Sequence, residues 1–345
     1  MVDKKGVKEA PRIGLPFERP IVELELKIGE LRSLSESTGM NLNGELTPLR
    51  EKLARMTRDI YENLAPYDVV QIARHPLRPQ TSDYIAGMLD EYVELHGDRR
   101  FSDDRAITTG FARIGERRFM LIGHRKGKET KENIACNWGC AHPEGYRKAL
   151  VKMKLAEKFG LPIVTLINTP GAYPGVGAEE RGQAWAIAEN IKTMARLKTP
   201  VICVIIGEGG SGGALGIGVG DRILMLEYAY YSVISPEGCA AILWKDGEKR
   251  DLAARAMKIT ARDLYELGVV DEIVVEPMGG AHTDYAATAR AVEDAVRRHL
   301  AEITAWNSDD RIKRRQEKYR QMGAWQSEAG IHAARRSDSP APTAS

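Results

Sequence analysis

The stretch GEGGSGGALGIGVGD at residues 207–221 constrains the fold of this chain more than any other feature. It follows VICVII at residues 201–206, an unbroken apolar run that predicts a buried strand. Each glycine disfavours a helix by about 1 kcal/mol relative to alanine, so only a short helix is expected from Ser211 onward. A strand, a glycine turn over residues 207–210 and a helix start together expose backbone N–H groups, which predicts a site for developing negative charge.

Two known motifs overlap in this stretch. Residues 207–212 match G-x-G-x-x-G, the dinucleotide-binding fingerprint, and Glu227 lies where a ribose-binding acid is expected. Residues 209–213 match G-x-S-x-G, the nucleophile elbow of hydrolases, which requires a histidine later in the chain. His282 follows Gly-Gly-Ala in a predicted loop and is the one candidate base, whereas Ser211 is more simply interpreted as a helix N-cap.

A second turn of the same kind precedes this one. Residues 163–168 predict a strand that ends in TPGAYPGVG at residues 169–177, with a helix after it. A dinucleotide site needs one such turn, whereas two adjacent turns predict two walls of one pocket. The second turn and the glycines inside the short helix therefore weaken the dinucleotide interpretation.

Short β-branched segments alternate with helical patterns through the middle of the chain, which predicts an α/β fold with parallel strand pairing. The predicted strands are residues 111–115 and 118–123, which form a hairpin, and residues 163–168, 201–207, 222–227 and 273–276. The predicted helices are residues 143–159, 179–197 and 260–267.

The two ends of the chain differ from this alternating zone. Residues 21–64 carry two amphipathic stripes, which predict a helical hairpin that either packs on its own domain or docks a partner. Residues 311–320 hold six basic residues against one acid and predict a solvated helix face, while the end, RRSDSPAPTAS, is expected to be disordered. We therefore predict a helical segment at 1–64, a central α/β domain at 65–300 and a basic helix end with a disordered tail at 301–345.

Net charge and cysteine content narrow the classes of partner. A formal net charge of +2 implies no strong attraction to nucleic acid or to a membrane. Four cysteines favour a reducing compartment, and the N-terminus lacks the apolar core of a signal peptide, so a cytoplasmic protein is expected. Cys136 and Cys140 lie near His142, but a structural zinc site needs four ligands, so no metal site is predicted in this chain.

Six long motifs occur in the chain in a fixed order. They are RHPLRPQTSDYI at 74–85, GHRKGKETKENI at 123–134, PEGYRKAL at 143–150, NTPGAYPGVGAEERGQ at 168–183, IGEGGSGGALGIGVGD at 206–221 and YSVISPEGCAAILWK at 231–245. Together they resemble the carboxyltransferase α subunits of bacterial acetyl-CoA carboxylase, and the resemblance extends from the N-terminal helices to about His282.

The resemblance implies a crotonase-type (ClpP/enoyl-CoA hydratase-like) superhelix of β-β-α units. It implies transfer of a carboxyl group to acetyl-CoA from carboxybiotin, which a separate biotin carboxyl carrier protein holds and a biotin carboxylase loads. The product is malonyl-CoA for fatty-acid synthesis. It also implies an α2β2 assembly whose β subunit carries a zinc ribbon and much of the acetyl-CoA site.

The resemblance also suggests site residues. Gly209 and Gly210 are expected to donate N–H groups to the biotin ureido oxygen, with Gly171 and Ala172 as the opposing wall. Further contacts to biotin, to CoA phosphates or to the partner are expected from Tyr173, Pro174, Gly175, Arg125, Lys126 and Lys128, although the last three also fit a solvated basic loop. No side-chain base is predicted. Other interpretations stay open: a carboxyltransferase or decarboxylase for another acyl-CoA, an NAD-dependent oxidoreductase, or a non-catalytic scaffold.

Overall fold

The computed structural model describes residues 14–323, 325–327 and 330–332 of the chain. The chain divides into two compact units, Met1–Leu64 and Ala65–Ser345. Within the described residues, no helix combines the length and the apolar composition that a membrane span requires.

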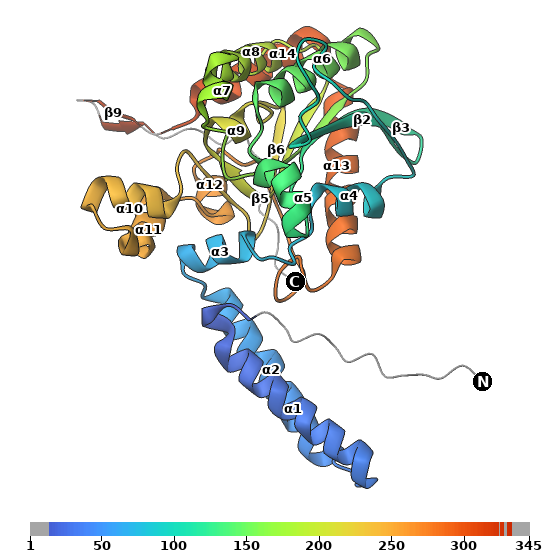
Figure 1. Cartoon of the computed structure of the whole chain (residues 1–345), viewed down its shortest axis with the longest axis vertical. Helices are drawn as coiled ribbons and strands as arrows, with labels where there is room; N and C mark the ends of the chain where they lie inside the picture. Colours follow the sequence, from blue (N-terminus) through green and yellow to red (C-terminus); the bar gives the residue numbers. More distant parts are fainter. Residues whose placement is uncertain (1–13, 324, 328–329, 333–345) are drawn as a thin grey trace. The chain divides into compact units, whose positions relative to one another are not determined.

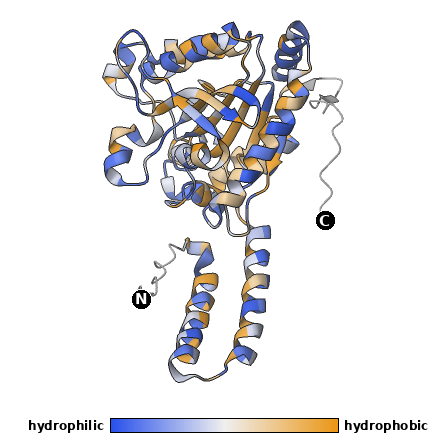
Figure 2. Ribbon diagram, turned by 90° about the vertical axis from the view of Figure 1, so that its right-hand side faces the viewer, coloured by the Kyte–Doolittle hydropathy of each residue, from blue (hydrophilic) through white to orange (hydrophobic). Residues whose placement is uncertain are grey.

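The described part of the first unit is a helical hairpin, which confirms the prediction from its amphipathic stripes. A short 3-10 turn, η1 (Pro16–Glu18), leads into α1 (Arg19–Thr38), and α2 (Asn43–Glu62) returns alongside it (Figure 2). Tyr61 links α2 back to the start of the unit. Its hydroxyl donates to Glu18 Oε1 at 2.8 Å, and its ring meets the Phe17 ring edge-on with 5.9 Å between centroids.

The second unit is built on a sheet whose strands follow one another almost in chain order. The order is β1-β2-β3-β4-β5-β6-β8, and β7 pairs with the end of β5. The first three strands are antiparallel, whereas the pairs from β3 to β8 are parallel. The strands are β1 (Glu91–Glu94), β2 (Ile107–Ile114), β3 (Arg117–His124), β4 (Ile163–Thr169), β5 (Val201–Gly210), β6 (Arg222–Leu226), β7 (Tyr230–Ser232) and β8 (Glu272–Val274).

Helices cover this sheet, with α6 and α8 packed together on one side and α13 beside α4 on the other (Figure 1). The helices of the unit are α3 (Pro66–Ala73), α4 (Thr81–Met88), α5 (Thr130–Ala135), α6 (Pro143–Lys158), α7 (Val176–Glu180), α8 (Gln183–Met194), α9 (Ser211–Leu215), α10 (Pro236–Trp244), α11 (Arg250–Met257), α12 (Ala261–Glu266), α13 (Tyr285–Thr304) and α14 (Ser308–Gln321). Two 3-10 turns, η2 (Asn137–Gly139) and η3 (Gly247–Lys249), and a short hairpin of β9 (Trp325–Ser327) and β10 (Gly330–His332) complete the described elements.

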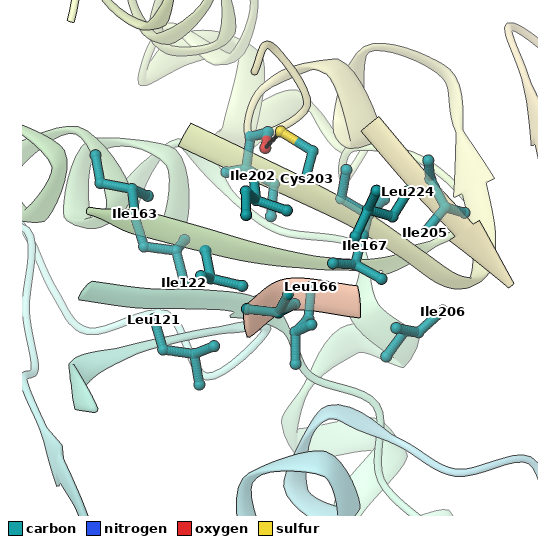
Figure 3. Packing of buried hydrophobic residues seen from close by; sticks show 14 of the residues in the cluster. Leu121, Ile122, Ile163, Leu166, Ile167, Ile202, Cys203, Ile205, Ile206 and Leu224 are labelled. Atoms are coloured by element: carbon teal, nitrogen blue, oxygen red, sulfur yellow. Dashed lines mark hydrogen bonds between the residues drawn. The ribbon is translucent and has the colours of Figure 1, made fainter. Parts of the chain in front are cut away.

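Strands β4 and β5 form the centre of the core. Every residue of both strands is buried, as expected for parallel strands covered on both faces. Figure 3 shows side chains of β3, β4, β5 and β6 packed together, with Ile167 and Leu166 of β4 among them. Burial of each such aliphatic side chain stabilises the fold by about 1.5–3 kcal/mol. This packing holds the ends of β4 and β5 side by side, with Thr169 opposite Gly209.

Most of the predicted strands are confirmed, but two predicted elements change. The strand expected to end at residue 207 continues as β5 through Gly210, so the turn predicted over residues 207–210 is wrong. Pairing with β7, which the sequence pattern did not indicate, holds residues 208–210 extended. The helix predicted over residues 179–197 is two helices, α7 and α8, because Gly182 between them has a left-handed φ of 80°.

The basic run at the C-terminal end lies in α14, where two of its arginines are buried rather than solvated. Arg311 donates to the carbonyls of Ile303 at 3.0 Å and Trp306 at 2.7 Å, at the end of α13. Arg315 is equally enclosed. The prediction of a solvated face is therefore wrong for these two, because helix ends leave carbonyls that need donors. The predicted boundary at residue 300 falls inside α13, and the predicted disordered end lies outside the described residues.

Candidate active site

A cavity of about 740 Å³ lies beside the ends of β4 and β5. Residues 170–172, which follow β4, form one part of its wall, and residues 211–212, which follow β5, form another. The start of α8, residues 182–185, and the segment 233–235 after β7 complete much of the lining. The two segments that the sequence predicted as turns therefore face one space.

The two walls touch through their backbones, and this contact requires glycine. A Cβ atom on Gly210 would lie 2.1 Å from the Pro170 carbonyl oxygen. A Cβ atom on Gly213 would lie 2.5 Å from the Ala172 nitrogen. Real Cβ atoms do not approach backbone this closely, so any side chain at either position would push the two walls apart.

Gly209 and Gly210 occupy the last two positions of β5 and are buried. Gly209 lies opposite Thr169 of β4 and Tyr231 of β7. Neither glycine lines the cavity, whose wall on this side is formed by the next two residues, Ser211 and Gly212. The predicted glycine pair thus lies directly behind the cavity wall.

Ser211 does not act as the helix cap that the sequence suggested. The N-cap position of α9 is Gly210, and no side chain makes a capping hydrogen bond there. Ser211 itself has a φ of 55°, the left-handed region that residues other than glycine rarely adopt. The candidate base of the hydrolase interpretation, His282, stacks on the His75 ring with 3.8 Å between centroids and is not among the residues that line the cavity with Ser211.

The loop that follows β4 rests on the chain before α6. Tyr173 donates its backbone N–H to the Ala141 carbonyl at 3.0 Å, and its ring stacks on His142 with 4.2 Å between centroids. The side chain of Gln183 donates to the Tyr173 carbonyl at 2.9 Å. The three predicted contact residues Tyr173, Pro174 and Gly175 adjoin the cavity wall but are not part of it.

In the basic loop after β3, two of the three predicted contact residues form ion pairs with described residues and the third does not. The Lys126 ammonium pairs with Glu208, which lies in β5. The Lys128 ammonium pairs with Asp83 at 2.5 Å and lies over the Tyr285 ring. Arg125 is exposed and makes no ion pair with a described residue. Of the three predicted phosphate contacts, Arg125 alone is therefore unengaged within the described part of the chain.

Sequence reasoning missed a charged network behind the cavity. Glu208 accepts hydrogen bonds from Arg74 Nε at 2.8 Å and from the Tyr230 hydroxyl at 2.7 Å, in addition to Lys126. Burial alone would raise the pKa of Glu208, but Lys126 and Arg74 lower it to about 2. The signal in the sequence was an acid placed among glycines in GEGG, directly after a predicted buried strand.

The structure does not form the strand, turn and helix that the dinucleotide fingerprint requires. The strand runs through Gly210, and α9 has five residues. The proposed ribose ligand, Glu227, accepts instead from the backbone N–H of Glu276 at 3.2 Å, and burial raises the pKa of its carboxyl group. Glu227 is thus engaged in packing β6 against the end of β8.

The cysteines are free thiols, and burial raises the pKa of both Cys136 and Cys140. Among the described residues, no group of three or more His, Cys, Asp or Glu side chains is arranged to hold a metal ion. His142, which lies near these two cysteines in the sequence, packs on Tyr173.

Two solved structures share the fold of this chain. A transcarboxylase 12S structure with methylmalonyl-coenzyme A bound matches with a TM-score of 0.52 and 21% identity, over 64% of this chain and 41% of that chain. A Pseudomonas malonate decarboxylase hetero-tetramer in complex with coenzyme A matches with a TM-score of 0.53 and 16% identity, over 63% of this chain and 86% of that chain. The sheet and its helices therefore form the crotonase-type fold of carboxyltransferases, as the sequence resemblance implied.

Sequence comparison gives the family. The family model described as acetyl co-enzyme A carboxylase carboxyltransferase-like matches residues 14–323. The acetyl-coenzyme A carboxylase carboxyl transferase subunit alpha of Gemmatimonas aurantiaca is 54% identical over 312 residues, 90% of this chain and 97% of that protein. The protein of the same name from Coxiella burnetii is 54% identical over 309 residues, 90% of this chain and 98% of that protein. The chain belongs to the family of acetyl-CoA carboxylase carboxyltransferase α subunits.

Proposed function

We propose that this chain, together with a carboxyltransferase β subunit, transfers a carboxyl group from carboxybiotin on a biotin carboxyl carrier protein to acetyl-CoA. The product is malonyl-CoA. Family membership over residues 14–323 carries this proposal. The cavity between two backbone walls supports it, because such transfer needs fixed hydrogen-bond donors rather than a nucleophilic side chain.

The lining of the cavity fits a thin, planar group such as the ureido ring of biotin. A Cβ atom on Gly212 would meet only Ile187, at 3.8 Å, and one on Gly171 would meet only the Ser211 Cβ, also at 3.8 Å. The backbone at both positions is therefore uncrowded and accessible. Biotin supplies a ureido group whose oxygen gains negative charge when the carboxyl group leaves.

The proposed donors to that oxygen lie at the junction of β5 and α9. Gly209 and Gly210 remain our proposal from the sequence, and the cavity lining extends it to Ser211 and Gly212. One backbone N–H fixed beside a developing oxyanion contributes about 3 kcal/mol to the transition state. The strained φ of Ser211 supports this role, since such conformations cluster at functional sites.

The remaining contacts are proposed from position. Gly171 and Ala172 line the cavity and form its opposing wall. Arg125, exposed at the end of β3, is the proposed contact for CoA phosphates, and Tyr173 supports the wall through its stacking on His142. Glu179 is the one carboxylate in the described lining, and we assign it no role in proton transfer; the methyl proton is proposed to pass to the biotin nitrogen that loses the carboxyl group.

Large apolar side chains near the cavity support a hetero-oligomer. Val176, Trp185 and Val233 are 75%, 76% and 79% exposed, and α10 adds Ile242 at 70%. Exposed apolar residues gathered in one region are typical of protein interfaces. We propose that the β subunit, which brings the zinc ribbon and much of the acetyl-CoA site, covers this region in an α2β2 assembly.

The proposal is tested by co-purifying this chain with a candidate β subunit and measuring malonyl-CoA formation. The assay supplies acetyl-CoA and a carrier protein loaded by a biotin carboxylase. We expect turnover only when both subunits are present. Turnover by this chain alone, or failure of the two subunits to associate, contradicts the proposal. Saturable binding of NADH to the chain would favour an oxidoreductase instead.

A further inference from the structure

The cavity has one source of positive charge in its wall. Of the described residues that line it, Arg74 is the only cation and Glu179 the only anion. The other lining groups are backbone, small residues, apolar side chains, Ser211, Ser235 and Gln183. A carboxylate that enters the cavity therefore has Arg74 as its one ionic partner among the lining residues that the structure describes.

Three hydrogen bonds orient the Arg74 guanidinium but do not occupy all of its N–H groups. Nε donates to Glu208 at 2.8 Å, one terminal nitrogen donates to Glu237 at 2.8 Å, and the other donates to the Tyr230 hydroxyl at 3.0 Å. A guanidinium carries five N–H groups, so two remain without a described partner. The side chain is 31% exposed and lines the cavity.

The charge on Arg74 is permanent, and Arg74 and Lys126 together face two carboxylates, Glu208 and Glu237. Burial alone would lower its pKa, but Tyr230 and Glu208 raise that pKa above the ordinary value. Glu208 also pairs with Lys126, which supplies a second positive charge for the one buried carboxylate. Glu237 is 33% exposed and shares its oxygen with the Tyr67 hydroxyl at 2.8 Å, so it screens Arg74 only in part.

We propose that Arg74 binds the carboxylate that is transferred. This inference rests on the proposed function. In the reaction a C–N bond to biotin breaks, a C–C bond to the acetyl methyl carbon forms, and the methyl proton ends on the biotin nitrogen. The same carboxylate is therefore present before and after transfer. One partly screened guanidinium holds it in both states without binding it so tightly that departure from either is prevented.

Equilibrium binding of two acyl-CoA ligands tests the proposal without turnover. The complex of this chain with its β subunit, free of carrier protein, is titrated calorimetrically with malonyl-CoA and with acetyl-CoA, which lacks the carboxylate. Arg74→Gln is expected to weaken malonyl-CoA binding roughly tenfold, as for loss of a charge-assisted hydrogen bond, and to leave acetyl-CoA binding unchanged. Arg74→Lys keeps the charge but loses the planar fork, so its effect is expected to be smaller.

A second variant makes the opposite prediction. Glu237→Gln keeps an oxygen to accept from Arg74 and Tyr67 but removes the competing negative charge. Malonyl-CoA binding is therefore expected to tighten roughly threefold, again with acetyl-CoA binding unchanged. A purely structural role of Arg74 predicts no such gain.

The matched control is Arg147→Gln, which removes another partly buried arginine that pairs with two carboxylates, Asp98 and Glu144, but does not line the cavity. It should leave the ratio of the two dissociation constants unchanged. If Arg74→Gln fails to assemble, Glu237→Gln decides: unchanged or weaker malonyl-CoA binding overturns the proposal. Equal ratios in the wild-type and Arg74→Gln complexes, with normal wild-type turnover, overturn this inference alone. A wild-type complex without turnover overturns the proposed function and the inference together.

Discussion

Arg315 and Arg74 each pair with a carboxylate of the same domain, yet their surroundings differ. Arg315 is fully enclosed, with 0% exposure for its side chain and for that of Asp221. All five of its N–H groups donate: two to Asp221, at 2.9 and 2.7 Å, and the others to the carbonyls of Met194, Leu197 and Thr199. Arg74 uses three N–H groups and borders a cavity.

The difference separates a structural cation from one that remains available to a ligand. Arg315 closes the end of α8 and the start of β5, since Asp221 also accepts from the backbone N–H of Val201 at 2.7 Å. Nothing is left on its guanidinium to bind anything else. Arg74 has the same kind of partner, but two of its N–H groups have no described partner and its side chain is 31% exposed. Burial and complete pairing, not residue type, distinguish the two.

The largest effect is expected from Asp221→Ala. This change leaves the Arg315 guanidinium buried without a counter-charge, which typically costs about 3–5 kcal/mol of the free energy of unfolding. Urea unfolding of the purified chain measures the loss, with Asp251→Ala on the exposed surface of α11 as the control, expected to cost less than about 1 kcal/mol. If Asp221→Ala lowers the free energy of unfolding no more than the control does, the conclusion that Arg315 is a structural cation is contradicted.

An intermediate effect, on activity rather than stability, is expected from Gly212→Ala. The added methyl group meets nothing closer than Ile187 at 3.8 Å, so the fold tolerates it, but it narrows the cavity at the proposed donor backbone. We expect kcat/KM of the assembled enzyme to fall roughly a hundredfold, the size of effect seen when one oxyanion donor is lost. The free energy of unfolding, measured in urea, should stay within about 1 kcal/mol of the wild-type value.

The control for this change is Gly247→Ala, where an added Cβ also meets nothing within 4 Å but which does not line the cavity. It should leave kcat/KM unchanged. Normal turnover by Gly212→Ala would show that this stretch of the wall does not contact the reacting group.

The smallest effect is expected from Glu208→Gln, which tests the buried carboxylate that pairs with Arg74. We expect a loss of about 1–3 kcal/mol of unfolding free energy near neutral pH, because Lys126 and Arg74 lose a charged acceptor. The pKa of Glu208 is lowered to about 2 in the folded chain from the ordinary value of 4.5, which applies to the unfolded chain. The contribution of ionised Glu208 to the free energy of unfolding is therefore complete above pH 4.5 and disappears as the pH falls toward 2.

Unfolding curves of the wild type and Glu208→Gln at several pH values check this sign. The difference between them should be constant from neutral pH to about pH 5 and narrow below pH 4.5. A difference that widens on acidification would mean that Glu208 is not held ionised by its two cationic partners.

Much of the fold followed from local patterns. The hairpin of β2 and β3, the strands β4 to β6, helix α6 and the N-terminal helical hairpin lie where periodicity and helix signals predicted them. Two errors occurred where a distant segment decided the outcome, whereas the division of the predicted helix at Gly182 is local. Pairing with β7 extended β5 beyond its predicted end, and the Lys198 carbonyl, 113 residues away along the chain, accepts from the buried Arg311. Local propensity carries no information about either partner.

The candidate site shows the same division. Both walls of the cavity were visible as glycine-rich segments after two strands. The network behind them was not, because Glu208 lies 134 residues from Arg74 and 82 from Lys126 along the chain. Charged residues follow no period that would indicate their partner, so nothing local distinguished Arg74 from the other arginines.

The sequence by itself determined the alternation of strands and helices, the family and the need for glycine where two backbone walls meet. Only the tertiary structure decided that β5 runs through Gly210, that Ser211 is left-handed rather than a cap, and that Arg315 is enclosed while Arg74 borders the cavity. The physical reason is that apolar periodicity and the conformational freedom of glycine are local properties of the sequence, whereas strand pairing is not. Desolvation and charge pairing depend on which distant segments the fold brings together.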